Sequence, residues 1–308
     1  MSVFNENGAL VYASNNLSMA NASLDSIIAE STRMDNILEG MINEAIGQIN
    51  AADIVLESVG YYNESVKEVL KNGWAKMLEG IKKFLDNALN FIESLAPSKK
   101  IILINKKKIT DKFNDVKNNE ALKSVIKEYN SVSEIDSKTL IDNIDVAFAK
   151  NKKIMQTGSL SSIDYIGEIG NAVGIELTKN WKQEILDSIG PKPSPSEDPS
   201  SINISDVITT ATSMDKNIPA IKQRLREVDK MIKDINNGDY IPDNYESANE
   251  DAKSAKFGLP IISFYCTTAL KSIKILAGSS VKLCMAVLKY KEPKNKDAKS
   301  NNSDTEEE

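Results

Sequence analysis

Acid–base, nucleophilic and zinc chemistry near neutral pH usually depends on histidine or cysteine, and this chain is poor in both. Its 308 residues include no histidine and two cysteines, Cys266 and Cys284. These cysteines lie on one expected helix, about 27 Å apart along its axis, so they cannot form a disulfide. Histidine-dependent triads, His/Cys zinc sites and CxxC redox pairs are therefore excluded, and we expect both thiols to be buried.

Other groups that could perform chemistry lack the spacing that the chemistry needs. The segment from Gly167 to Gly174 contains glycines but matches neither a dinucleotide-binding pattern nor a P-loop. The acids between residues 243 and 251 lack the spacing and central glycine of an EF-hand loop, and no carboxylate pair stands out for glycoside hydrolysis. We therefore expect no catalytic residue, no cofactor and no metal ion, and we do not expect an enzyme.

Lysines gather at two places where they could meet a partner. One set surrounds a short apolar run within residues 99–108, and the other lies on residues 257–290, a segment that has no acid. At 100° per residue the second set falls on one narrow stripe of a helix. The candidate interaction surface comprises Lys99, Lys100, Lys106, Lys107, Lys108, Lys271, Lys274, Lys282 and Lys289.

Each lysine set has more than one interpretation. Residues 99–108 are either a solvated basic surface or a contact with packaged DNA or an acidic neighbour. Residues 257–290 are either the central helix of a bundle with a wet edge, which we favour, or a cationic helix lying on a membrane. Their longest uncharged run, residues 257–270, contains Pro260 and is shorter than the roughly 20 residues of a membrane span. We therefore expect no stable transmembrane insertion.

Apolar residues recur at intervals of three and four along most of the chain, which predicts amphipathic helices. Residues 14–95 form a helical hairpin or one kinked rod, with a break at Gly60, a weaker one at Gly73 and an end at Pro97. The run at 101–104 is either a strand or a helix start. Further helices are expected within 109–153, as two short helices joined near 130–137, and at 176–189, 204–235 and 257–290. The predicted fold class is mostly α, with long amphipathic helices packed as an elongated helical bundle and little or no sheet.

Charge and proline content divide the chain into segments. The net charge is −6 overall, but residues 1–96 are acidic and residues 97–153 are basic, so the charge changes sign at Pro97. Residues 190–201 contain four of the nine prolines and form a solvated, semi-rigid linker candidate. The expected organisation is an N-terminal long-helix segment (1–96), a basic connector with short helices (97–190), a Pro/Ser-rich linker (191–201), a C-terminal helical segment (202–290) and a disordered charged tail (291–308).

Four segments together give the chain a resemblance to a known class of proteins. They are LSMANASLDSIIAESTRMDNILEG, NGWAKMLEGIKKFLDNALNFIESL, the Lys-rich APSKKIILINKKKITDKF and FGLPIISFYCTTALKSIKILAGSSVKLCMAVLKYK. In this order they resemble the internal or head-associated structural proteins of large tailed bacteriophages. The resemblance implies a non-enzymatic assembly protein in many copies in or on the particle, with other virion proteins, further copies of itself and packaged DNA as candidate partners.

The N-terminal sequence bears on where such a protein would be made. Residues 1–17 contain no lysine or arginine and no continuous apolar core, so we expect no secretory signal and no basic transit peptide. The expected history is synthesis in the bacterial cytoplasm followed by incorporation into the virion. The alternative function is that of a helical pore-forming or membrane-active protein that uses the cationic apolar helix at 257–290.

Overall fold

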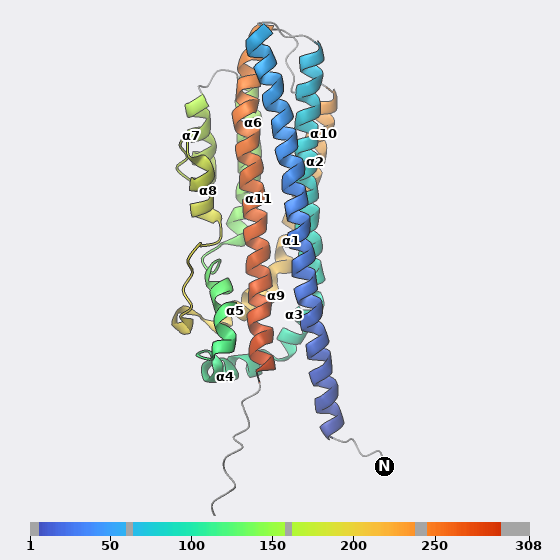
Figure 1. Cartoon of the computed structure of the whole chain (residues 1–308), viewed down its shortest axis with the longest axis vertical. Coiled ribbons are helices and arrows are strands. Elements are labelled where there is room, and N and C mark those ends of the chain that lie inside the picture. Colours follow the sequence, from blue (N-terminus) through green and yellow to red (C-terminus); the bar gives the residue numbers. More distant parts are fainter. Residues whose placement is uncertain (1–5, 60–63, 158–161, 238–244, 291–308) are drawn as a thin grey trace, which may run out of the picture.

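The chain folds as an elongated bundle of helices that run along its long axis (Figure 1). A computed structural model describes residues 6–59, 64–157, 162–237 and 245–290, and none of these residues lies in a β-strand. The predicted class, mostly α with long packed helices and little or no sheet, is confirmed. The helices are α1 (Glu6–Val59), α2 (Glu64–Ser94), α3 (Ala96–Ile104), α4 (Lys106–Val116), α5 (Glu120–Asn130), α6 (Ser137–Thr157), α7 (Ser162–Val173), α8 (Trp181–Ile189), α9 (Ile204–Ser213), α10 (Ile218–Asn237) and α11 (Tyr245–Lys289), with the 3₁₀ helices η1 (Pro199–Ser201) and η2 (Met214–Asn217).

The first two helices lie antiparallel and in contact (Figure 1), so the hairpin is confirmed and the single kinked rod is wrong. The break expected at Gly60 lies outside the described residues. The weaker break expected at Gly73 is absent, because α2 runs through it without interruption. A Cβ on Gly73 would lie 2.7 Å from Ile49 Cγ1 and one on Gly80 would lie 2.5 Å from Ile42 Cγ1. These two glycines therefore let α2 approach α1 closely.

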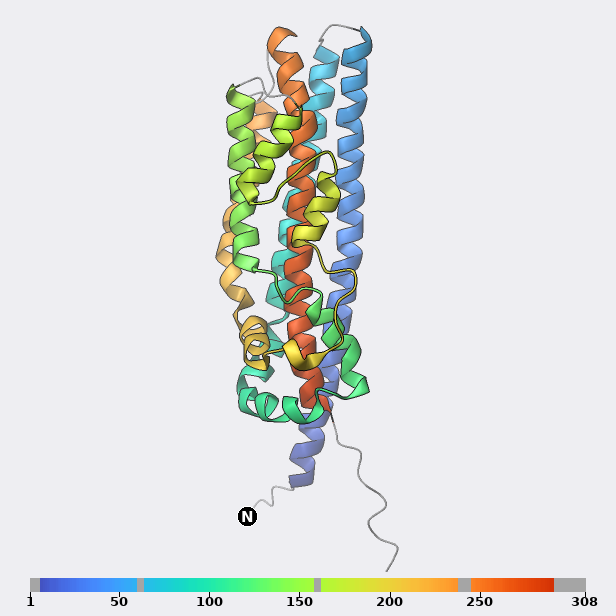
Figure 2. The ribbon, with the colours of Figure 1, turned by 90° about the vertical axis from the view of Figure 1, so that its left-hand side faces the viewer.

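Helix α11 is the centre of the bundle. The small number of charged residues in 257–290 favoured this central position over one on a membrane surface. It contacts every helix from α1 to α9 (Figures 1 and 2). Nearly every side chain from Ile261 to Leu288 is buried or half-buried, because the helix presents apolar groups in almost all directions. Pro260 lies inside the helix without ending it. No helix in the described part of the chain combines the length and apolar character needed to cross a membrane.

The basic connector is helical throughout its first part. The run at 101–104 is helix and not strand. Pro97 lies in the first turn of α3, just after the end of α2, because proline is tolerated in a first helical turn. Residues 109–153 contribute to three helices where two were expected. The additional boundary lies at Asn119, whose side chain accepts a hydrogen bond from the backbone N–H of Ala121 and so caps α5.

Two later helices are also shorter than their patterns predicted. The helix expected at 176–189 begins only at Trp181. The helix expected at 204–235 is divided into α9, η2 and α10, with Pro219 in the first turn of α10. Proline fits a first turn but would remove a backbone hydrogen bond in the middle of a continuous helix.

The Pro/Ser-rich linker is fastened to the bundle. The backbone N–H of Lys192 donates to Ser131 O at 2.8 Å, and Asn130 Nδ2 donates to the carbonyl oxygens of Ser196 (2.9 Å) and Asp198 (3.3 Å). Helices on both sides of the linker share one hydrophobic core, since α10 packs on α2 and α11 packs on α1 and α6. The linker therefore connects parts of one bundle. The tail at 291–308 lies outside the described residues.

Candidate functional site

The nine lysines singled out from the sequence belong to two separate places in the fold. Four lie on α11, where Lys274 is buried and the other three are half-buried, and five lie on α3 and α4, which cross one end of the bundle (Figure 1). We call the first set the lysine seam; it comprises Lys271, Lys274, Lys282 and Lys289. The two sets are not brought together, so they form no single surface.

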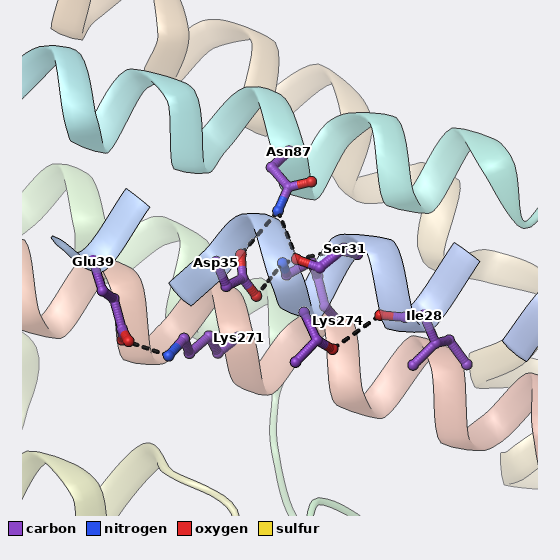
Figure 3. Close-up of polar contacts among 8 residues, drawn as sticks. Ile28, Ser31, Asp35, Glu39, Asn87, Lys271 and Lys274 are labelled. Carbon is purple, nitrogen blue, oxygen red and sulfur yellow. Dashed lines mark hydrogen bonds and ion pairs between the residues drawn. The ribbon is translucent and has the colours of Figure 1, made fainter. Parts of the chain in front are cut away.

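The centre of the lysine seam is a buried polar cluster between α11, α1 and α2 (Figure 3). Lys274 Nζ forms an ion pair with Asp35 Oδ2 and donates to Ser31 Oγ at 3.1 Å. Asn87 Nδ2 donates to Asp35 Oδ1 at 2.8 Å and to Ser31 O at 3.2 Å. The carboxylate of Asp35 thus receives hydrogen bonds from two different helices, as a buried charge requires.

Burial is the main electrostatic influence on this cluster. Removing the Lys274 ammonium group from water lowers its pKa, and the attraction and hydrogen bond of Asp35 oppose that shift. The ring of Phe84 adds a cation–π contact, with its centroid 5.8 Å from Nζ. Lys274 and Asp35 are both buried and are each other's ion-pair partner inside the protein. Both also line a pocket, together with Lys271 and Glu128.

The rest of the lysine seam is also directed toward acids of the same chain. Lys271 pairs with Glu39 of α1, one helical turn from Asp35 (Figure 3). Lys282 pairs with Glu128 of α5 at 3.1 Å. Burial lowers the pKa of Lys289, and the charge of Asp25 opposes that effect. The stripe predicted as a wet edge thus stays partly exposed at Lys271, Lys282 and Lys289, while acids of α1 and α5 neutralise part of it.

The lysines of α3 and α4 are placed differently. Lys99 pairs with Asp215 at 2.5 Å, and this hydrogen bond holds the pKa of Asp215 below its ordinary value. Lys100, Lys106, Lys107 and Lys108 are exposed, and none of them forms an ion pair with an acid of the described chain.

Two apolar side chains share this surface. Leu103 is 51% exposed and Ile104 is 75% exposed. We call the surface made by Lys100, Leu103, Ile104, Lys106, Lys107 and Lys108 the basic cap. A shallow depression beside Ile104 is lined by Lys107, Lys108 and Asp111, among others.

Local packing explains why the basic cap faces outward. Ile102 of α3 and Ile109 and Phe113 of α4 are buried, and they fix which side of each helix faces the core. Sequence analysis identified the lysines but missed Leu103 and Ile104. The signal was available in Ile-Ile-Leu-Ile at 101–104, because four consecutive apolar residues point in all directions around a helix, and a helix packed on one side only leaves some of them exposed.

The remaining features that could carry chemistry have structural roles. Gly174 ends α7 with a φ of 72°, a left-handed conformation that glycine adopts without strain. Burial raises the pKa of both thiols, that of Cys284 to about 12, which suppresses their reactivity. In the described part of the chain, no three acidic or cysteine side chains are grouped as metal ligands would be. The side chains of the acids at 243–251 lie outside it.

No family model matches the chain, and no curated protein or solved structure matches it. The fold and its surfaces therefore have to support the functional argument. Of the two lysine sites, the lysine seam holds helices together inside the molecule, whereas the basic cap is open to solvent. The basic cap is thus the candidate interaction surface.

Proposed function

We propose that this chain is a non-enzymatic structural and assembly protein of a tailed-bacteriophage particle, head-associated or internal, which binds its neighbour through the basic cap. The observation that carries the proposal is the exposure of Leu103 and Ile104 among lysines that form no ion pair with the described residues, at one end of the bundle. The other large apolar side chains exposed in the described chain lie singly on four different helices. Adjacent exposed apolar groups ringed by charge are typical of protein contact sites.

The form of the molecule supports a structural role. Long helices, one continuous core and an internal ion-pair seam suit a rigid element of an assembly. The four segments that resemble virion structural proteins correspond to α1, α2, α3 with α4, and α11, which form a large part of the bundle. The phage part of the proposal rests on that resemblance.

The chemistry of the basic cap favours one kind of partner. Burying Leu103 and Ile104 is favourable only against an apolar surface, at roughly 25 cal/mol per Å² removed from water. The surrounding lysines favour acidic side chains at the edge of that surface. A protein face with apolar residues ringed by acids satisfies both, whereas a DNA backbone would satisfy only the lysines.

Quantitative mass spectrometry of density-purified phage particles, made in cells that encode this chain, tests the proposal. We expect the protein in the particles at a reproducible copy number. Absence from mature particles and from assembly intermediates would contradict a virion role.

A mobility-shift titration with duplex DNA at two salt concentrations tests the nature of the partner. We expect the wild-type protein to bind DNA no more strongly than a variant with Lys106, Lys107 and Lys108 changed to Gln.

A second candidate function is membrane activity of α11, which is favoured by its apolar side chains on nearly all sides. To reach a lipid bilayer, α11 would have to leave every helix from α1 to α9 and expose the Lys274 ion pair. We therefore expect no dye leakage from anionic liposomes on addition of the folded protein. Leakage at low protein concentration would favour this function over the structural one.

A further inference from the structure

A groove runs beside α11 where α1 and α8 pack against it on either side (Figure 1). Pro260, Ser263, Phe264 and Thr267 of α11 line it, and their spacing of three and four places them on one face of that helix. The groove has a volume of about 470 Å³, within the range of small-molecule sites. We call it the side groove; it lies next to α8, whereas the basic cap lies on α3 and α4 at one end of the bundle.

Aromatic and aliphatic side chains form much of the side groove. Trp181, the first residue of α8, and Phe264 meet edge to face, with ring centroids 5.6 Å apart. Both side chains are only half-buried, so part of each remains accessible. Ile42 and Ile46 of α1 line the same groove. A flat apolar molecule that enters it would pack on these rings and remove apolar surface from water.

One polar group that lines the side groove has no partner. Ser263 is 1% exposed, and its Oγ forms no hydrogen bond within the described chain. Other buried hydroxyl groups of α11 donate to backbone carbonyl oxygens, among them those of Thr267, Ser272 and Ser280. A buried hydroxyl group without a partner costs free energy. An oxygen atom of a ligand at this position would recover that cost.

The charged groups of the side groove are opposite in sign and already engaged. Glu39 forms an ion pair with Lys271. The Lys182 ammonium group lies 5.4 Å from the centroid of the Trp181 ring, as a cation–π contact. With one acid and one base among its lining residues, the side groove has no net charge. It therefore favours a neutral ligand over an ion of either sign.

We propose that the side groove binds a small, neutral, flat aromatic molecule that carries one hydroxyl or carbonyl oxygen. The ring of the ligand packs against Trp181 and Phe264, and its oxygen forms a hydrogen bond with Ser263 Oγ. The site goes beyond the proposed function, because it involves no residue of the basic cap and does not depend on incorporation into a particle.

Isothermal titration calorimetry of the full-length protein with 2-naphthol tests the site. The probe is neutral and flat, and it carries one hydroxyl group. We expect saturable binding with a dissociation constant of about 0.1–1 mM, as for a fragment-sized ligand of ordinary efficiency. No saturable binding in this range would overturn the proposal.

Two matched variants locate the bound probe. Asn43 of α1 is exposed and lines the side groove, whereas Asn114 of α4 is exposed and does not line it. Asn43→Phe should fill the groove and weaken binding at least about tenfold, and Asn114→Phe should bind like wild type. Both should keep the urea midpoint of wild type, since both positions are exposed. Equal affinity of the two variants would place the probe elsewhere and overturn the proposal.

Ser263→Ala tests the hydrogen bond. The change removes a hydroxyl group that has no partner in the described chain, so the protein should remain at least as stable as wild type to urea. We expect the variant to bind 2-naphthol about threefold to tenfold more weakly, the worth of one net hydrogen bond. Unchanged affinity would overturn the assignment of Ser263 as the polar anchor.

The charge of the ligand is tested with 2-naphthoate, which has the same ring system and a carboxylate at neutral pH. We expect it to bind at least about fivefold more weakly than 2-naphthol, because its charge must lose water beside Glu39. Equal or tighter binding would overturn the neutral class of ligand. None of these titrations measures incorporation into particles, so failure of the side groove and failure of the proposed function are separate results.

Discussion

Lys274 of α11 and Asp35 of α1 form an ion pair whose side chains are only 5% and 7% exposed. The two residues are 239 positions apart in the chain, so the pair joins the first and last helices of its described part. The attraction between two buried charges is offset by the hydration that both lose, so such a pair adds little to the free energy of unfolding. Its larger effect is to determine which groups of the two helices must meet. We therefore interpret the pair as the element that sets the register of α11 against α1.

Breaking the pair from one side should be strongly destabilising. Asp35→Leu leaves the Lys274 ammonium group and the Asn87 amide without their acceptor, and Lys274→Met leaves a buried carboxylate. We expect each change to lower the free energy of unfolding by about 3–5 kcal/mol. The double variant Asp35→Leu/Lys274→Met should recover most of that loss. Urea unfolding with all four proteins measures the cycle, and additive effects of the two single changes would contradict a coupled pair.

Stability should also depend on pH through Lys274. Burial lowers its pKa in the folded protein below 10.5, its ordinary value. Between those two values the unfolded chain binds more protons than the folded one, so the free energy of unfolding rises with pH in that window and falls as the pH drops through the folded-state pKa. We expect wild type to gain stability relative to Asp35→Leu/Lys274→Met as the pH rises toward 10.5. A constant difference between their urea midpoints would contradict this.

The linker should detach when its side-chain anchor is removed. Asn130 is buried and holds the carbonyl oxygens of Ser196 and Asp198. Asn130→Ala should destabilise the protein by about 1–3 kcal/mol, because it leaves polar backbone groups unsatisfied. It should also speed cleavage of residues 190–198 by proteinase K, which limited proteolysis with mass mapping detects. The exposed Asn118→Ala serves as the control, and equal cleavage of the two variants would argue against fastening by Asn130.

Neither cysteine should react while the bundle is folded. Cys266 and Cys284 are buried, and burial raises the pKa of each thiol. We expect no alkylation by iodoacetamide near pH 8 under native conditions and two alkylations after unfolding in guanidinium. Intact-mass measurement counts the adducts. Rapid modification of either cysteine in the native protein would show that α11 is more open than its packing indicates.

The fold class could be predicted from the sequence because it depends on local periodicity. Spacings of three and four define a helix wherever they occur, and the scarcity of charge on residues 257–290 already indicated a helix enclosed by others. The boundaries at Asn119 and Pro219 depend on a cap and a first-turn proline. These signals are weak beside the continuous apolar pattern that runs across them, so longer helices were predicted.

The environment of the lysines could not be predicted in the same way. Lys274 is buried only because α1 meets α11 in the register that brings Asp35 to it. That register is set by contacts between residues far apart in the chain. Asp35 and Glu39 look like ordinary solvated acids of an amphipathic helix. The exposure of Leu103 and Ile104, by contrast, could have been inferred from the four consecutive apolar residues at 101–104.

The central claim is that the basic cap joins this protein to its neighbour in the particle. The most direct measurement is a competition in infected cells that express wild type and Leu103→Asp/Ile104→Asp together, with the ratio of their distinguishing peptides measured in the lysate and in purified particles. Both side chains are exposed, so the variant should fold with a urea midpoint like that of wild type. We predict that the variant falls at least about tenfold in particles relative to lysate, a difference of about 1.4 kcal/mol in binding. An equal ratio in particles and lysate would contradict the claim.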